Sequence, residues 1–137
     1  MIVVPQSGAS VLLEKGLDGL TATQHVRLYQ NDYAPSPTSL LADFVAATYD
    51  GYAAAAITPA TWPIFLQGIS QAVAVGPGLV FSPTGSTTPN LIYGYYVTDN
   101  TGARLLWAER FAEPKVLNGV TTGFTLVPAI GGQSAAG

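Results

Sequence analysis

The sequence predicts an all-β protein, a β-sandwich or jelly roll of about eight strands with one short helix. Three features indicate this class. Glycines (15) and prolines (10) are spread through the 137 residues, the runs between them are rich in β-branched and aromatic side chains, and several runs alternate apolar with polar residues. The length is that of one domain with a sizeable core. We expect three parts: an N-terminal arm at residues 1–24, a β-sandwich domain at residues 25–128 and a C-terminal tail at residues 129–137.

The expected arm differs in character from the rest of the chain. Ile2, Val3 and Val4 can form a short strand, which Pro5 ends. The apolar run at residues 11–20 contains two glycines, which argue against a stable helix. We therefore expect an extended arm whose apolar side chains lie on the domain or on a neighbouring subunit. The alternative is an ordinary first strand followed by a surface loop of one compact domain.

The domain begins with a strand and a helix. Residues 25–31 alternate, with Val26 and Leu28 on one side, as in a half-buried strand. After a loop that contains two prolines, Thr38 can cap a short helix at about residues 38–47. Its apolar stripe would consist of Leu40, Leu41, Phe44 and Val45.

Three further strands are expected in the middle of the chain. Residues 52–58 are rich in alanine, which allows close packing against a second layer, and residues 69–75 alternate. A third strand starts at residues 79–81. Loops rich in glycine, proline and serine separate these strands.

A hairpin at residues 90–111 is the clearest motif. Its strands, residues 91–98 and 103–111, are joined by Asp99-Asn100-Thr101-Gly102, which suits a type I turn with Gly102 in the left-handed conformation as a bulge. The resulting register pairs Val97 with Leu105 and Tyr95 with Trp107. One face then carries Leu91, Tyr93, Tyr95, Val97, Leu105, Trp107, Glu109 and Phe111. The other, mixed face carries Ile92, Gly94, Tyr96, Thr98, Arg104, Leu106, Ala108 and Arg110.

The chain after the hairpin is expected to turn twice. Glu113-Pro114 should break it, and residues 116–117 and 120–127 should then form a last pair of strands around Asn118-Gly119. Pro128 ends the last strand.

Charge is sparse in this chain. Only 9% of the residues are charged, against about a quarter in an ordinary soluble domain, whereas 48% are hydrophobic. A net charge of −3 gives a free monomer little to keep it in solution, so we expect partners to cover much of the surface. The alternative is a monomer with a neutral surface of Thr, Ser, Asn and Gln. The acidic balance and the scarcity of Lys and Arg argue against nucleic-acid binding.

The sequence shows no membrane or secretion signal. No apolar run approaches the roughly 20 residues that span a bilayer, and the N-terminus lacks the regions of a signal peptide. Without cysteine, neither a disulfide nor a thiolate metal site can form. We expect a soluble protein that is made in the cytoplasm and has no membrane partner.

Catalytic motifs are not found. The single histidine, His25, lies in an alternating strand without a nucleophile elbow nearby, and no acidic run has calcium-loop spacing. The glycine-rich stretches are typical of turns rather than phosphate loops. Asp43 with Asp50, or Glu109 with Glu113, are conceivable carboxylate pairs of a glycoside hydrolase, but the spacing supports them no better than chance. We expect no enzyme, no cofactor and no metal.

The aromatic residues of the hairpin allow two interpretations. Tyr93, Tyr95, Tyr96 and Trp107 could form a sugar-stacking platform, or they could belong to the core and a subunit interface, which we favour. The register places Tyr96, Arg104 and Arg110 on the mixed face, and these are our candidates for the oligomer interface. A solvated face is the alternative.

Several blocks of sequence resemble small structural proteins of tailed bacteriophages. The most specific are L-A-D-F-x-x-A-T-Y-D-G-Y at residues 41–52, I-Y-G-Y-Y-V-T-D at residues 92–99 and L-L-W-A-E-R-F at residues 105–111. R-L-Y-Q-N-D at residues 27–32 and F-S-P-T-G-S at residues 81–86 add to the match. The resemblance covers roughly residues 25–127 and is weak in the arm and tail.

The resemblance implies a protein of the virion, on the exterior of the capsid. Some such proteins are capsid decoration or cement proteins, commonly trimers, whose partner is the major capsid protein, and the resemblance brings no catalytic motif. In that role the arm would contact capsid subunits through Ile2, Val3, Val4, Val11, Leu12 and Leu13. The alternative is a receptor- or glycan-binding module of a tail or head fibre.

Overall fold

The computed structural model describes residues 2–3, 23–57, 64–67, 71–75, 78–85, 90–117 and 123–131. Over these residues the protein is all-β, as predicted, and all strand pairs are antiparallel. The one helical element in these ranges is a 3-10 turn, η1, at Leu41–Asp43. The strands are β1 (Ile2–Val3), β2 (Gln24–Tyr29), β3 (Ala55–Ile57), β4 (Ile64–Gln67), β5 (Gln71–Val75), β6 (Leu79–Phe81), β7 (Asn90–Thr98), β8 (Leu105–Leu117), β9 (Phe124–Leu126) and β10 (Ala129–Gly131).

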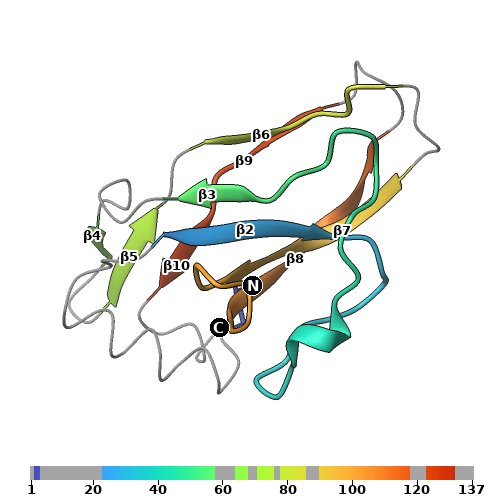
Figure 1. Cartoon of the computed structure of the whole chain (residues 1–137). Helices are drawn as coiled ribbons and strands as arrows, with labels where there is room; N and C mark the ends of the chain where they lie inside the picture. Colours follow the sequence, from blue (N-terminus) through green and yellow to red (C-terminus); the bar gives the residue numbers. More distant parts are fainter. Residues whose placement is uncertain are drawn as a thin grey trace.

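One layer is a five-stranded sheet in the order β1-β8-β7-β2-β3 (Figure 1). Two smaller sheets, β10-β5-β4 and β6-β9, form the second layer. Val75 pairs with Ala129, and Leu79 pairs with Leu126. The β6–β9 pairing therefore continues the register of the β5–β10 pairing, with an offset of one residue. Figure 1 shows the two pairs following each other along one side of the molecule.

The main core lies between the five-stranded sheet and the β6–β9 pair. Trp107 of β8 and Tyr95 of β7 are among its largest fully buried side chains, and Phe81 of β6 and Leu126 of β9 close it from the second layer. Its other buried members are Val26, Leu28, Ala47, Tyr49, Ile57, Ile92, Val97, Leu106 and Leu117. This packing of two sheets confirms the sandwich-like character that the sequence predicts.

The opposite face of the five-stranded sheet is also covered. Successive side chains of a strand point to opposite faces, so Tyr96 points away from the main core while Tyr95 and Val97 point into it. Tyr96 belongs to a second cluster, formed by Tyr29, Phe44, Tyr96, Leu105 and Ala108. The Phe44 ring stacks on Tyr96 with ring centroids 4.9 Å apart, so the segment between β2 and β3 covers this face.

The prediction of a helix at residues 38–47 is wrong. Only Leu41–Asp43 is helical, and Phe44 already has the extended angles φ −104° and ψ 131°. The N–H of Ala47 donates to the carbonyl of Leu28 at 3.0 Å, which adds this segment to the edge of β2. The edge of β2 provides hydrogen-bond partners for the backbone of the segment, and Phe44 is buried in the second cluster. Together these tertiary contacts outweigh a weak local preference for helix.

The predicted turn of the hairpin is confirmed. Gly102 has φ +75°, and its N–H donates to the Asp99 carbonyl at 3.1 Å. The Asp99 carboxylate accepts from the Thr101 hydroxyl at 2.8 Å and from the N–H groups of Thr101, Ala103 and Arg104. Partial burial works against the charged form, but these hydrogen bonds outweigh it and lower the pKa of Asp99.

The predicted register of the hairpin is wrong. Val97 pairs with Trp107 and Thr98 with Leu105, so Leu106 is an extra residue on β8. This bulge places both Leu106 and Trp107 in the main core and moves Leu105 to the second cluster. Alternation in the sequence could not reveal the bulge, because both faces of the hairpin carry large apolar side chains and either register buries some of them.

Strand β8 also continues where a break was expected. It runs through Pro114 to Leu117, and the register shifts between the pairs Gly94–Arg110 and Ile92–Lys115. Pro114 falls within this irregularity, where the ladder does not need the N–H that proline lacks. The expected last pair is wrong as well, because β9 pairs with β6. Residues 118 and 119 lie outside the described ranges.

The two ends of the chain contribute strands. Ile2 and Val3 pair with Glu109 and Ala108, so β1 is an edge strand of the five-stranded sheet. The first residues of the expected tail form β10, which pairs with β5. Strand β4 was not predicted, although it coincides with an apolar run, Ile64–Gln67.

Gly94 lets the backbone of β8 and the ring of Tyr29 pack directly against β7. A substitution at this position therefore tests the packing of the sheet. A Cβ at this position would overlap the carbonyl oxygen of Glu109 and lie 2.6 Å from Tyr29 Oη. We expect Gly94→Ala to lower the free energy of unfolding by about 3 kcal/mol, because a strand backbone cannot move aside. The matched control is Gly78→Ala, whose Cβ would meet a Thr125 methyl at 3.3 Å. Urea denaturation followed by tryptophan fluorescence should show a loss below about 1 kcal/mol for this control, and equal losses would contradict the assignment.

Candidate functional site

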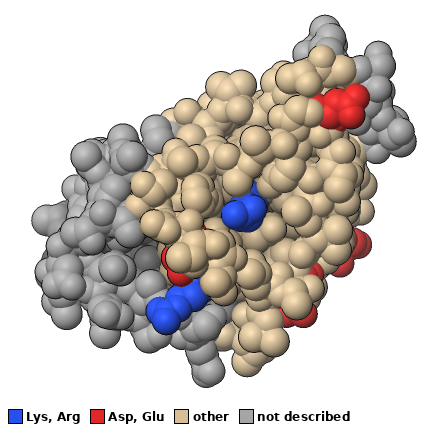
Figure 2. All heavy atoms as spheres, viewed as in Figure 1, with Lys and Arg blue, Asp and Glu red and all other residues tan. Residues whose placement is uncertain are grey.

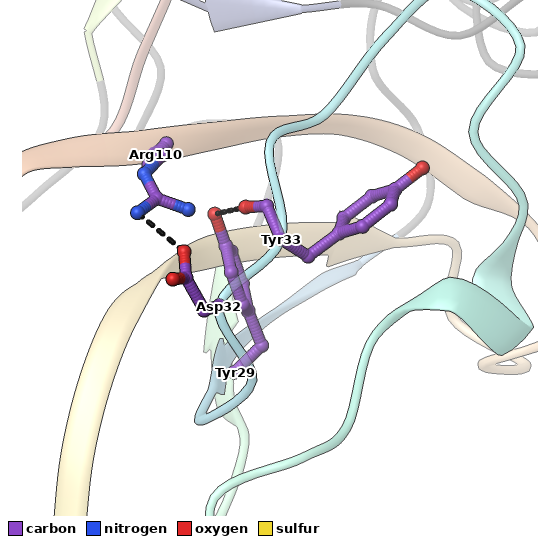
Figure 3. Close-up of polar contacts among 4 residues, drawn as sticks. All are labelled: Tyr29, Asp32, Tyr33 and Arg110. Atoms are coloured by element: carbon purple, nitrogen blue, oxygen red, sulfur yellow. Dashed lines mark hydrogen bonds and ion pairs between the residues drawn. The ribbon is translucent and has the colours of Figure 1, made fainter.

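The first candidate surface surrounds Arg110, on the face of the second cluster (Figure 3). Arg110 Nη2 lies 2.6 Å from Asp32 Oδ1, and its guanidinium lies 5.2 Å from the centre of the Tyr93 ring. Tyr29 donates its hydroxyl proton to the carbonyl of Tyr33 at 3.1 Å. The ion pair connects the loop after β2 to β8, and the Tyr29 hydrogen bond connects the same loop to β2. The ion pair is exposed, so it contributes at most about 1 kcal/mol.

A hydroxyl network fixes the next part of this loop. Tyr33 Oη lies 2.7 Å from the buried Ser39 Oγ and donates to the Asp43 carboxylate at 3.2 Å. The same carboxylate accepts from the N–H of Leu40 at 2.8 Å, which closes the turn η1. Ser39 Oγ forms hydrogen bonds with Tyr33 and Ser36, and neither residue is a base. The network is therefore suited to holding a loop rather than to activating a nucleophile.

The three predicted interface residues do not form one surface. Tyr96 is only 5% exposed, because Phe44 covers it, so our expectation that it faces a partner is wrong. Arg110 is half-buried and already has an ion pair within the chain. Arg104 is exposed at the end of the hairpin loop. A partner could reach Arg104 and part of Arg110, but not the ring of Tyr96.

The sugar-stacking platform is not present. Tyr95 and Trp107 are each 1% exposed, within the main core, which confirms the core part of the interpretation that we favoured. Tyr93 packs at the margin of the second cluster. Three of the four rings therefore have no face that a sugar could stack on.

Catalytic and metal chemistry finds no support in the described part of the chain. No group of three or more His, Asp or Glu side chains in it could hold a metal ion. Glu109, one of the conceivable catalytic carboxylates, accepts a hydrogen bond from Tyr95 Oη at 2.8 Å. Asp43, from the other pair, closes η1. Neither of these two carboxylates is free. The described ranges contain no helix with the length and hydropathy to cross a bilayer.

The arm candidates divide into two groups. Ile2 and Val3 pair with β8 through their backbones, as in the alternative of an ordinary first strand. Val4, Val11, Leu12 and Leu13 lie outside the described residues.

A surface that the sequence analysis missed is the second layer. Residues 51–98 contain no Asp, Glu, Lys, Arg or His, and neither do residues 116–137. Strands β4, β5 and β6 fall in the first stretch, and β9 and β10 fall in the second. The fold brings these two distant stretches together, so the whole layer lacks ionisable side chains of these types. The spacing of charges along the chain was the signal that could have found it.

The outer side of this layer exposes apolar residues. Along β6, Phe81 is buried whereas Val80 is 73% exposed. Beyond β9, Val127 is 54% exposed, and Thr125, which pairs with Val80, is exposed too. We call Val80, Thr125 and Val127 the neutral face. In the view of Figure 2, the charged side chains of the described residues occupy only small parts of the surface that these residues form.

Comparison with known proteins finds no match among family models, curated proteins or solved structures.

Buried tyrosines give a pH test of this arrangement. Burial raises the pKa of Tyr49 and of Tyr52 to about 12, and it also raises those of Tyr29 and Tyr96. An unfolded chain releases these protons near pH 10, whereas the folded chain holds them until a higher pH. The stability that each protonated tyrosine contributes is therefore fully present below about pH 10. This contribution is lost as the pH rises toward about 12.

Each such tyrosine adds a slope of up to about 1.4 kcal/mol per pH unit to the free energy of unfolding in that window. We expect Tyr49→Phe to give a shallower decline than the wild type between about pH 10 and 11.5, and similar stability at neutral pH. Urea midpoints across this range measure the slopes. Parallel slopes for the two proteins would show that Tyr49 is not protected from ionisation.

Proposed function

We propose that this chain is a non-enzymatic structural protein of a tailed-bacteriophage virion. In this role it decorates and stabilises the capsid from outside by binding at junctions between major capsid subunits. The observation that carries the proposal is the neutral face, together with a charge content of only 9%. Exposed valines on a layer without charges are typical of a surface that another protein covers.

The architecture suits a protein that works in many copies. The five-stranded sheet is packed on both faces, and a body packed in this way has little conformational freedom to lose on binding. Each copy would add a modest contact, and many copies would distribute the resistance of the shell to internal pressure. We propose that the copies act as a homo-oligomer, for which the resemblance implies a trimer.

A receptor- or glycan-binding module of a fibre is the weaker proposal. It relied on the tyrosines and tryptophan of the hairpin, and Tyr95, Tyr96 and Trp107 are buried.

The test uses undecorated shells assembled from the major capsid protein of the phage that encodes the chain. The wild-type protein should co-sediment with these shells and saturate at a fixed number of copies per shell. Failure to bind would overturn the proposed function. A reconstruction of the virion that places the protein on the tail would also overturn it.

The contribution of the arm is tested separately with Val11→Asp/Leu12→Asp, which leaves β1 unchanged. If the arm lies on capsid subunits, the two buried carboxylates should reduce shell binding at least about tenfold. The matched control is Leu40→Asp/Val45→Asp, which places the same charge on exposed residues of the body and should bind as the wild type does. Full occupancy by the arm variant, or an equal loss in the control, would exclude the arm as the contact.

A further inference from the structure

We propose that the neutral face is the surface through which copies of this chain associate, with the charge-free layers of neighbouring copies turned toward the symmetry axis of the oligomer. This deepens the proposed function by assigning a surface to its oligomer. It replaces the set Tyr96, Arg104 and Arg110, which the fold does not bring together.

The orientation of the side chains is the first argument. In β6 and β9, Phe81 and Leu126 point into the main core, so the residues that alternate with them point outward. On a solvated antiparallel sheet these outward positions normally carry polar and charged residues. Here they are Val80, Thr125 and, just beyond β9, Val127. Contact with a partner removes these apolar side chains from water, which is favourable, and these residues carry no charge whose desolvation would cost free energy.

The location of the charges is the second argument, and it favours a second copy as the occupant. No strand of the second layer contains an acidic residue, and the six acidic residues of the described ranges lie in other segments. Eight acidic against five basic residues give the whole chain its net charge of −3. Copies that approach through other faces bring like charges together. Copies that approach through their second layers bring together strands without charged side chains, although the Asp50 carboxylate lies close to Gly85, four residues beyond the end of β6. A strongly charged partner would instead lose hydration at this face and gain no counter-charge in return.

The expected strength of association follows from the size of the layer. Its described strands are only three to five residues long. An interface built on them lies toward the small end of specific interfaces, so association should depend on protein concentration. It should also persist in salt, because no ion pair contributes to it.

The experiment is sedimentation equilibrium on the full chain at concentrations up to about 100 µM, without shells. The wild type should form a defined oligomer. Val80→Asp/Val127→Asp should raise the dissociation constant at least about tenfold, because carboxylates of neighbouring copies would be buried near one another. Both side chains are outside the core, and circular dichroism checks that the variant is folded.

The matched control is Val45→Asp/Val116→Asp. It makes the same two substitutions at valines that are 49% and 56% exposed but lie outside the second layer. It should associate as the wild type does, and about 0.5 M sodium chloride should not dissociate either protein.

Three results would overturn the inference: a monomeric wild type, undiminished association of Val80→Asp/Val127→Asp, or dissociation by salt. The shell assay separates this from failure of the proposed function. A monomer that binds shells through the neutral face would reassign that face to the capsid and leave the proposed function standing. An oligomer that does not bind shells would support the inference and overturn the proposed function.

Discussion

Strand β7 is hydrogen-bonded to β2 along one edge and to β8 along the other, and both of its faces are buried. Tyr95 and Val97 enter the main core, while Tyr96 enters the second cluster. A sheet whose centre is apolar on both sides needs a cover on each side. The second layer is one cover, and the segment between β2 and β3 is the other. Most of the remaining architecture follows from this requirement.

The two covers are built in different ways. The second layer consists of strand pairs, and Phe81 and Leu126 reach from it into the main core. The segment between β2 and β3 consists of a turn and an extended run, which the backbone bond to Leu28 and the hydroxyl network around Tyr33 hold in place. The ion pair between Arg110 and Asp32 adds a further, exposed tie. The segment between β2 and β3 is therefore held by hydrogen bonds and an ion pair, whereas the strands of the second layer contain no charged residue.

This asymmetry connects the fold to the proposed role in an assembly. The body has one side that water can solvate through its charges and another whose exposed side chains include Val80 and Val127. A protein with two such sides can meet its own copies through the neutral side and leave the charged side for solvent or for other partners. This division of surfaces offers a physical reason why the chain carries few charges: one of its sides meets a protein rather than water.

The all-β class, the positions of β2, β6 and β7, and the turn with Gly102 in the left-handed conformation followed from local rules of alternation and turn chemistry. Those rules act over a few residues, and the sequence satisfies them without help from distant segments. The core position of Tyr95 and Trp107 followed in the same way.

Contacts between distant residues decided the rest. The bulge at Leu106 and the passage of β8 through Pro114 depend on how two apolar faces are filled, which alternation cannot resolve. The helix expected at residues 38–47 gave way to pairing with β2, because Phe44 is needed over Tyr96. The charge-free stretches were visible in the sequence, but only the pairing of β6 with β9 and of β5 with β10 joins them into one surface. Strand pairing across such separations is set by the packing of the whole chain, and so no local pattern encodes it.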